Sequence, residues 1–196
     1  MPADPPDFSS GIDALFAPKR VAVVGASTDP TRVSGRPLSF LAEWGFAGEL
    51  AVVNPRRETV LGHPSYASVS NLPFVPDLAV VCVPAERVLD SLEQCAERGV
   101  RAAIVFAAGF GEITGGCPDE PAIRELAIAS GMAVCGPNCL GTISVEDRLP
   151  ATFSTVLTEA SLRSGDVALV TQSGALGMYL YAEAARRGVG FSRWVS

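Results

Sequence analysis

Residues 20–37 read RVAVVGASTDPTRVSGRP, and this stretch decides the fold. It begins with a short β-branched run over 20–25, which is apolar throughout its middle and therefore predicts a strand buried on both faces. A glycine-containing loop follows, and a helical pattern then runs over 36–44. A strand, a glycine turn and a helix in this order are typical of the parallel sheets of α/β proteins.

The same pattern returns along the rest of the chain. Further strands without polar alternation are expected over residues 50–53, 78–83, 102–107, 132–135 and 167–171. Helical patterns are expected over residues 12–16, 85–99, 121–130 and 174–187. Because buried strands alternate with helices, the predicted fold class is α/β, with a Rossmann-like doubly wound parallel sheet.

Composition excludes several classes of function. The 15 Lys and Arg against 21 Asp and Glu give a net charge of −6, so a nucleic-acid backbone would meet net repulsion. The longest apolar runs stop far short of the roughly 18 residues that cross a bilayer. The first residues, MPADPPDFSSG, show no signal-peptide pattern. We therefore expect a cytoplasmic protein with neither a nucleic-acid nor a membrane partner.

Cysteine and histidine usage argues against a disulfide framework and against a metal site. The five cysteines lie mostly among apolar neighbours, which favours reduced thiols: they are Cys82, Cys95, Cys117, Cys135 and Cys139. With a single histidine in the chain, a zinc site has too few ligands, so no metal is expected.

Changes in polarity and in the alternation of strand and helix patterns along the chain suggest two domains. We expect a loose leader over residues 1–10 and a main domain over 11–150. Residues 142–164 interrupt the strand–helix rhythm with mixed polarity and a proline, which predicts a boundary near Pro150. A new strand and helix follow in 151–196, and the last residues, FSRWVS, resemble the opening of a strand without a partner downstream. The second domain is thus expected to be present only in part.

Two loops at strand ends carry the chemistry. The loop GASTDPTRVSGRP, residues 25–37, has the position of a phosphate-binding turn but not the G-x-G-x-x-G spacing, so a plain tight turn fits equally well. The second strand ends in VVNPRR, where Arg56 and Arg57 replace the acidic residue that reads the ribose of NAD. Guanidinium groups there suit the ribose phosphate of NADP or of coenzyme A (CoA), or they are simply solvated.

Six segments together make the pattern specific. VAVVGAST, VVNPRR, LAVVCVPA, AAIVFAAGFGE, CGPNCLG and VALVTQSGALG occur in this order between residues 21 and 177. The chain from about Phe16 to Ser196 therefore resembles the CoA-binding domain of the nucleoside-diphosphate-forming acyl-CoA synthetases, relatives of the succinyl-CoA synthetase α subunit. The resemblance implies a CoA-binding domain followed by the beginning of a flavodoxin-like ligase domain.

The resemblance also implies which residues bind CoA. In this family the turn after the first strand holds the CoA phosphates, and the basic position after the second strand meets the 3′-phosphoadenosine end. Later loops line the adenine and pantetheine path towards the thiol. Carried over position by position, the residues are Gly25, Ala26, Ser27, Ser34, Gly35, Asn54, Arg56, Arg57, Val83, Pro84, Ala108, Gly109, Phe110 and Asn138.

The loop TQSGALG, residues 171–177, joins the last predicted strand to the last helix, and Ser173 is a plausible N-cap. The resemblance implies that this helix start meets the phosphate of a phosphohistidine. The residues concerned are Gln172, Ser173, Gly174 and Ala175. An ordinary capped helix is the alternative interpretation.

No catalytic residue is assigned. His63 is the only histidine and stands in a predicted loop, where a structural or solvated role is expected. Glu112 is expected to have a loop role and Cys139 a packing role, because no histidine is placed to activate either. The resemblance puts the catalytic histidine and the ATP-grasp domain, with its ADP, ATP and Mg²⁺, outside these 196 residues, so this chain alone is expected to be inactive.

The function implied is thus the CoA-binding portion of an ADP-forming acyl-CoA synthetase. That enzyme interconverts acyl-CoA, ADP and phosphate with acid, CoA and ATP through acyl phosphate and phosphohistidine. Its partners would be CoA and the remaining ligase and ATP-grasp domains or subunit, and a homo-oligomer is also plausible. Two alternatives stay open: an NADP-binding oxidoreductase domain, and a non-catalytic CoA-binding module or part of a protein acetyltransferase.

Overall fold

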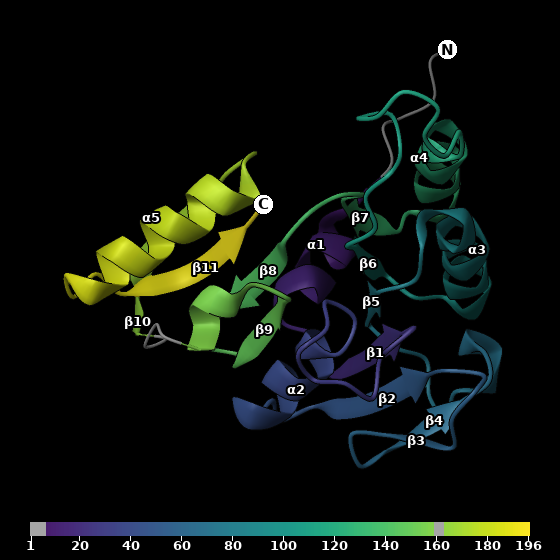
Figure 1. Cartoon of the computed structure of the whole chain (residues 1–196), viewed down its shortest axis with the longest axis horizontal. Coiled ribbons are helices and arrows are strands. Elements are labelled where there is room, and N and C mark those ends of the chain that lie inside the picture. The colour runs from purple at the N-terminus through teal and green to yellow at the C-terminus, as the bar shows by residue number, and fades with distance from the viewer. Residues whose placement is uncertain (1–6, 159–162) are drawn as a thin grey trace.

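The computed structural model describes residues 7–158 and 163–196, and its larger sheet confirms the predicted fold class (Figure 1). Seven strands lie in the order β3-β4-β2-β1-β5-β6-β7. They are β1 (Arg20–Val24), β2 (Glu49–Val53), β3 (Thr59–Val60), β4 (His63–Tyr66), β5 (Leu78–Val81), β6 (Ala102–Val105) and β7 (Ala133–Cys135). Every pairing is parallel except that of β3 with β4.

The strand order reverses between β1 and β5. From β1 the chain moves outward through β2 to β4, and it then returns to the other side of β1 for β5, β6 and β7. The loops that leave the carboxyl ends of β1 and β5 therefore diverge. In open α/β sheets ligands bind at such a topological switch point, so the fold itself indicates where a site should lie.

Helices cover both faces of this sheet, as Figure 1 shows. The helices are α1 (Ser9–Phe16), α2 (Arg36–Glu43), α3 (Val88–Arg98) and α4 (Glu120–Ser130), with short 3₁₀ turns η1 (Val69–Asn71), η2 (Ala85–Arg87) and η3 (Thr155–Thr158). Val21 and Val23 of β1 pack into the core under α1 and α2, whereas Ala22 and Val24 pack under α3 and α4. Both faces of β1 are buried, which explains why its sequence lacks polar alternation.

A second, four-stranded sheet follows, in the order β10-β11-β8-β9. Its elements are β8 (Gly141–Ser144), β9 (Leu149–Thr152), β10 (Ser164–Val170), α5 (Gly174–Arg186) and β11 (Phe191–Val195). The last strand, β11, pairs with two strands that precede it in the chain, with β10 in parallel and with β8 antiparallel. The predicted domain boundary near Pro150 falls within β9 and stays a prediction.

The β8–β9 hairpin forms the first part of the segment, residues 142–164, that interrupts the strand–helix rhythm in the sequence. Hydroxyl side chains in these strands give the segment its mixed polarity. In the structure, Thr142 Oγ1 donates to the Leu15 carbonyl (3.2 Å) and Ser144 Oγ donates to Asp147 Oδ2 (2.6 Å). A hydroxyl with a partner can be buried at little cost, so polar residues here are compatible with fully buried strands.

The edge of the larger sheet also differs from expectation. We expected a loop around His63, but the structure forms the short β3–β4 hairpin, in which Val60 pairs with His63. Both strands are short and β4 contains Pro64, so the sequence shows no strand pattern here.

Among residues 7–158 and 163–196, the helices are all too short or too polar to traverse a lipid bilayer.

Candidate functional site

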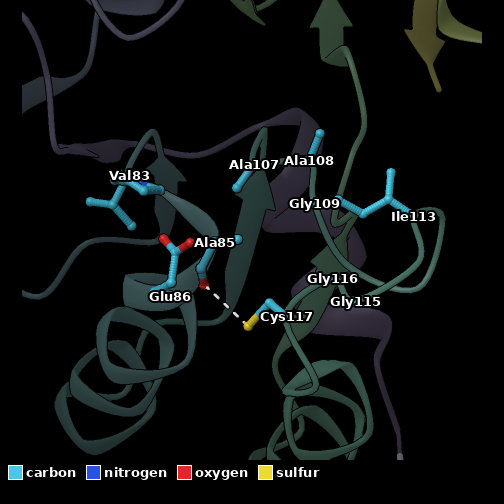
Figure 2. A pocket seen from close by; sticks show the side chains of 11 residues that line it. Val83, Ala85, Glu86, Ala107, Ala108, Gly109, Ile113, Gly115, Gly116 and Cys117 are labelled. Atoms are coloured by element: carbon cyan, nitrogen blue, oxygen red, sulfur yellow. Dashed lines mark hydrogen bonds between the residues drawn. The ribbon is translucent and has the colours of Figure 1, made fainter.

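A groove lies at the switch point, over the carboxyl ends of β1, β5 and β6. Its first cavity, of about 480 Å³, is lined by Arg32, Val33, Ser34, Cys82, Val83, Pro84, Phe106, Ala107 and Ala108. A second cavity, of about 400 Å³, adjoins it and shares its Val83, Pro84, Ala107 and Ala108. Figure 2 shows Val83 and Glu86 on one side of the second cavity and Ile113 and Cys117 on the other. We take this groove as the candidate binding site.

The predicted site residues divide between this groove and its supports. Ser34, Val83, Pro84, Ala108 and Gly109 line one or both cavities. The other predicted residues line neither cavity. Sequence reasoning missed the other lining residues, which are Arg32, Val33, Cys82, Phe106 and Ala107 in the first cavity and Ala85, Glu86, Ala107, Ile113, Gly115, Gly116 and Cys117 in the second. The available signal was their position in the same strand-end loops as the predicted residues.

The β1–α2 loop forms one wall of the groove, and Gly25 begins it with a left-handed φ of +82°. A Cβ atom on Gly25 would lie 2.7 Å from Val83 Cγ1, so the glycine allows the loops after β1 and β5 to touch. The loop closes on itself through a hydrogen bond from Ser27 N–H to the Ser34 carbonyl (3.1 Å). Ala26 exposes no surface, so it shapes the turn from within the core.

The loop after β2 carries the predicted basic pair. Arg56 and Arg57 are exposed and lie outside both cavities. Neither has an ion-pair partner in the part of the chain that the structure describes, so both guanidinium groups are available to a ligand anion. Asn54 is different, because its side-chain amide is already hydrogen-bonded to Ala26 and Arg56.

The loop after β6 is organised by an internal carboxylate. Glu112 accepts hydrogen bonds from the backbone N–H groups of Gly109 and Phe110, and the bond from Gly109 is the main cause that lowers the pKa of Glu112. This loop role agrees with the sequence-based expectation. The Phe110 side chain is buried in the core under α3 and α4 and does not reach the groove surface, whereas Ala108 is exposed there.

The loop after β7 places Asn138 at the same edge of the sheet. Asn138 is exposed with a left-handed φ of +57°, and its N–H donates to the Ala107 carbonyl (2.8 Å). Its neighbour Cys139 is buried, with its thiol 3.4 Å from the Val105 carbonyl. The adjacent Cys135 thiol and burial raise the pKa of Cys139, which makes it a poor nucleophile and fits the predicted packing role.

The start of α5 lies against this loop, because Gly174 packs on the Leu140 side chain. Ser173 is the N-cap as predicted, and its Oγ accepts a hydrogen bond from Leu176 N–H (3.3 Å). Gln172 and Ala175 are exposed beside it. The positive end of the α5 dipole and its free N–H groups thus face the region of the β7 loop.

His63 lies on β4, which β2 separates from β1. It is partly buried and stands apart from the groove lining. The structure brings no histidine to the candidate site within the described residues, so the groove offers binding surfaces and no imidazole for catalysis.

Comparisons with known proteins show the family of this chain. A family model described as a CoA binding domain matches residues 19–144, and one described as a succinyl-CoA ligase like flavodoxin domain matches residues 164–196. The chain is 38% identical over 187 residues to the α subunit of acetate–CoA ligase (ADP-forming) II from Pyrococcus furiosus. That match covers 94% of this chain and 39% of the relative.

Other relatives and a solved structure give the same result. The chain is 39% identical over 186 residues to acetate–CoA ligase (ADP-forming) I from Archaeoglobus fulgidus, covering 94% of this chain and 26% of the relative. It also matches the dinucleotide-forming acetyl-coenzyme A synthetase 1 from Candidatus Korarchaeum cryptofilum, solved with phosphate and ADP. That likeness has a TM-score of 0.87 and 36% identity, over 95% of this chain and 39% of the other. The chain therefore spans about two fifths or less of these relatives.

Proposed function

The chain belongs to the CoA-binding domain family, and on that premise we propose that it is the CoA-binding portion of an ADP-forming acyl-CoA synthetase. The groove between β1 and β5 carries the proposal, because it lies at the switch point of the sheet in the segment that matches the family. The relatives quoted are ligases, so the similarity favours this function over an NADP-dependent oxidoreductase.

We propose that the ligand lies along the groove with its charged end towards the β1 and β2 loops. The turn at Gly25 and Ser27, with Ser34 and Gly35, would hold the diphosphate. Arg56 and Arg57 would pair with the 3′-phosphate, for which charge-assisted hydrogen bonds are suited. Behind them, the apolar walls at Val83, Pro84 and Ala108 suit the uncharged parts of the molecule. Asn138 would stand towards the thiol end.

In the proposed reaction the CoA thiol carries the acyl group, which it accepts when acyl-CoA is formed and gives up when ATP is formed. In the direction of ATP formation, an acyl group passes from acyl-CoA to phosphate with release of CoA. The phosphoryl group of the resulting acyl phosphate then passes to a histidine and on to ADP, which leaves acid and ATP. His63 is the only histidine in the 196 residues and lies away from the groove, so the reacting imidazole would belong to another segment or subunit. The segment Gln172 to Ala175, which leads into α5, would receive that phosphohistidine.

The wider organisation follows as part of the same proposal. We place the CoA-binding domain at 11–150 and the beginning of the ligase domain at 151–196. ADP, ATP and Mg²⁺ would bind to an ATP-grasp domain that other polypeptide provides.

Titration calorimetry with CoA and with NADP tests the function. Both ligands carry a ribose phosphate, so charge alone does not distinguish them, whereas a groove shaped for pantetheine does. We expect CoA to bind at least about tenfold more tightly than NADP, which corresponds to roughly 1.4 kcal/mol. Tighter binding of NADP would refute the proposal.

The arginine pair gives a second test. Changing Arg56 and Arg57 together to Ala should weaken CoA by about tenfold to a hundredfold, because charge-assisted bonds to the 3′-phosphate are lost. Dephospho-CoA lacks that phosphate, so its affinity should fall by less than about threefold. Arg124→Ala removes an exposed arginine on α4 and serves as the control. If the affinities for CoA and for dephospho-CoA fell equally, Arg56 and Arg57 would not bind the 3′-phosphate.

A further inference from the structure

Asn54 joins the two loops that the proposed function uses. It follows the last residue of β2, and its side-chain Nδ2 donates to the Ala26 carbonyl in the β1 turn (2.9 Å). Its Oδ1 accepts a hydrogen bond from the backbone N–H of Arg56 (2.9 Å). One side chain thus connects the turn after β1 directly to the arginine loop.

The backbone of Asn54 adds connections to the next strand. Its N–H donates to the Tyr66 carbonyl (2.9 Å), and its own carbonyl accepts from Ser65 Oγ (3.2 Å) and from Arg57 N–H (3.3 Å). Asn54 therefore holds together β4, the arginine loop and the β1 turn.

The chemistry of the position requires an amide. The Ala26 carbonyl needs a donor and the Arg56 N–H needs an acceptor, and among short side chains only Asn presents both in one plane. An Asp would keep the acceptor but set a carboxylate against the Ala26 carbonyl. An Ala would leave both groups without their partner.

We propose that Asn54 is a positioning residue, which fixes Arg56 and Arg57 relative to the β1 turn and so sets discrimination for the 3′-phosphate. The sequence suggested direct contact with CoA, but the amide already has protein partners. The β1 turn is held independently by the bond between Ser27 and Ser34, whereas the arginine loop is exposed. Loss of the Asn54 side chain should therefore increase the mobility of Arg56 and Arg57 more than that of the β1 turn.

The inference rests on the proposed function, and the two can be tested separately in the full 196-residue chain. The readout is the ratio of the dissociation constants for dephospho-CoA and CoA, measured by calorimetry. In the wild type this ratio tests the arginine assignment itself. Asn54→Asp is nearly isosteric: it loses the donor to Ala26, keeps an acceptor for Arg56 N–H and adds a negative charge, while Asn54→Ala removes both bonds. Asn71→Asp, at an exposed Asn that is hydrogen-bonded to nearby Ser68, is the matched control.

We expect Asn54→Asp and Asn54→Ala to lower the ratio by about fivefold or more, with Asn71→Asp unchanged. In a background that already lacks Arg56 and Arg57, Asn54→Asp should not change the ratio further, because the groups it positions are gone. Asn54→Asp remains measurable if Asn54→Ala fails to fold.

A purely structural role gives a different result. The thermal midpoint would then fall while both ligands weaken equally and the ratio stays at its wild-type value, which would overturn the inference. A wild-type ratio near one would overturn the arginine assignment, and the positioning role with it. If Asn54→Asp lowers the ratio of dissociation constants equally in the presence and in the absence of Arg56 and Arg57, the positioning role is also contradicted.

Discussion

Gly35→Ala should weaken CoA binding on the order of a hundredfold, because it displaces one wall of the groove. Gly35 precedes α2, where the chain folds back over its own loop. A Cβ atom on Gly35 would collide with the backbone carbonyl of Asp29 and lie 2.8 Å from the Asp29 carbonyl carbon. Both are backbone atoms, so the loop that carries Ser34 would have to move.

The strain at Gly35 is steric and not conformational, because its φ of −98° is accessible to any residue. We expect the free energy of unfolding to fall by about 2 kcal/mol, the range found for overpacked sites. Gly111→Ala is the matched control, since the contact under 3 Å there is only with the end of the Glu120 side chain. Calorimetry and urea unfolding of both variants check the prediction. Wild-type CoA affinity in Gly35→Ala would contradict it.

Asp77→Ala should lower the free energy of unfolding by about 3 kcal/mol, because it removes the acceptor that joins three strands at the amino edge of the sheet. Asp77 is 6% exposed. Its Oδ2 accepts from the N–H groups of Lys19 (2.9 Å) and Arg20 (3.0 Å), and its Oδ1 accepts from Arg101 Nη2 (2.8 Å). The variant leaves two backbone donors unpaired near the start of β1. Urea unfolding at neutral pH measures the loss.

Asp77 also predicts a pH dependence. Burial acts most strongly and raises its pKa, but the hydrogen bonds from Arg101, Lys19 and Arg20 together hold the pKa below the ordinary 3.8. A carboxyl whose pKa is lower in the folded state stabilises the fold above its unfolded pKa, and this contribution is lost as pH falls through the folded value. The stability advantage of wild type over Asp77→Asn should therefore be constant near neutral pH and shrink below about pH 4.

Asp13→Asn, at an exposed carboxyl on α1, is the control for general charge effects. An advantage of the wild type that is the same at about pH 3 as at about pH 7 would show that ionised Asp77 does not stabilise the sheet.

The sequence predicted the parallel core well because its strands are buried on both faces. β1, β2, β5, β6 and β7 all lie within the predicted runs or within two residues of them. Gly99 and Gly131 end α3 and α4 with left-handed φ values of +81° and +70°, as glycine at a helix end predicts. In each case the residue types of a short segment carry the information. A strand buried on both faces requires apolar residues, and a positive φ at a helix end favours glycine.

The hairpins were not predictable in the same way. β8 and β9 are buried strands that contain Thr142, Ser144 and Thr152, and their hydroxyl groups are tolerated only because distant or neighbouring groups bond to them. Leu15, the partner of Thr142, lies 127 positions earlier in the chain. No local pattern reports such a partner, so the sequence of this region looks irregular.

The candidate site shows the same division. The amino-acid sequence by itself determined the parallel sheet, the glycine turn after β1, the basic pair after β2 and the resemblance to a CoA-binding family, because each depends on residue type and order along the chain. Only the tertiary structure decided that Arg32 lines the groove, that Phe110 lies in the core and that the Asn54 amide joins two loops. Those facts depend on contacts between loops that meet only when β1, β2, β5 and β6 are placed side by side.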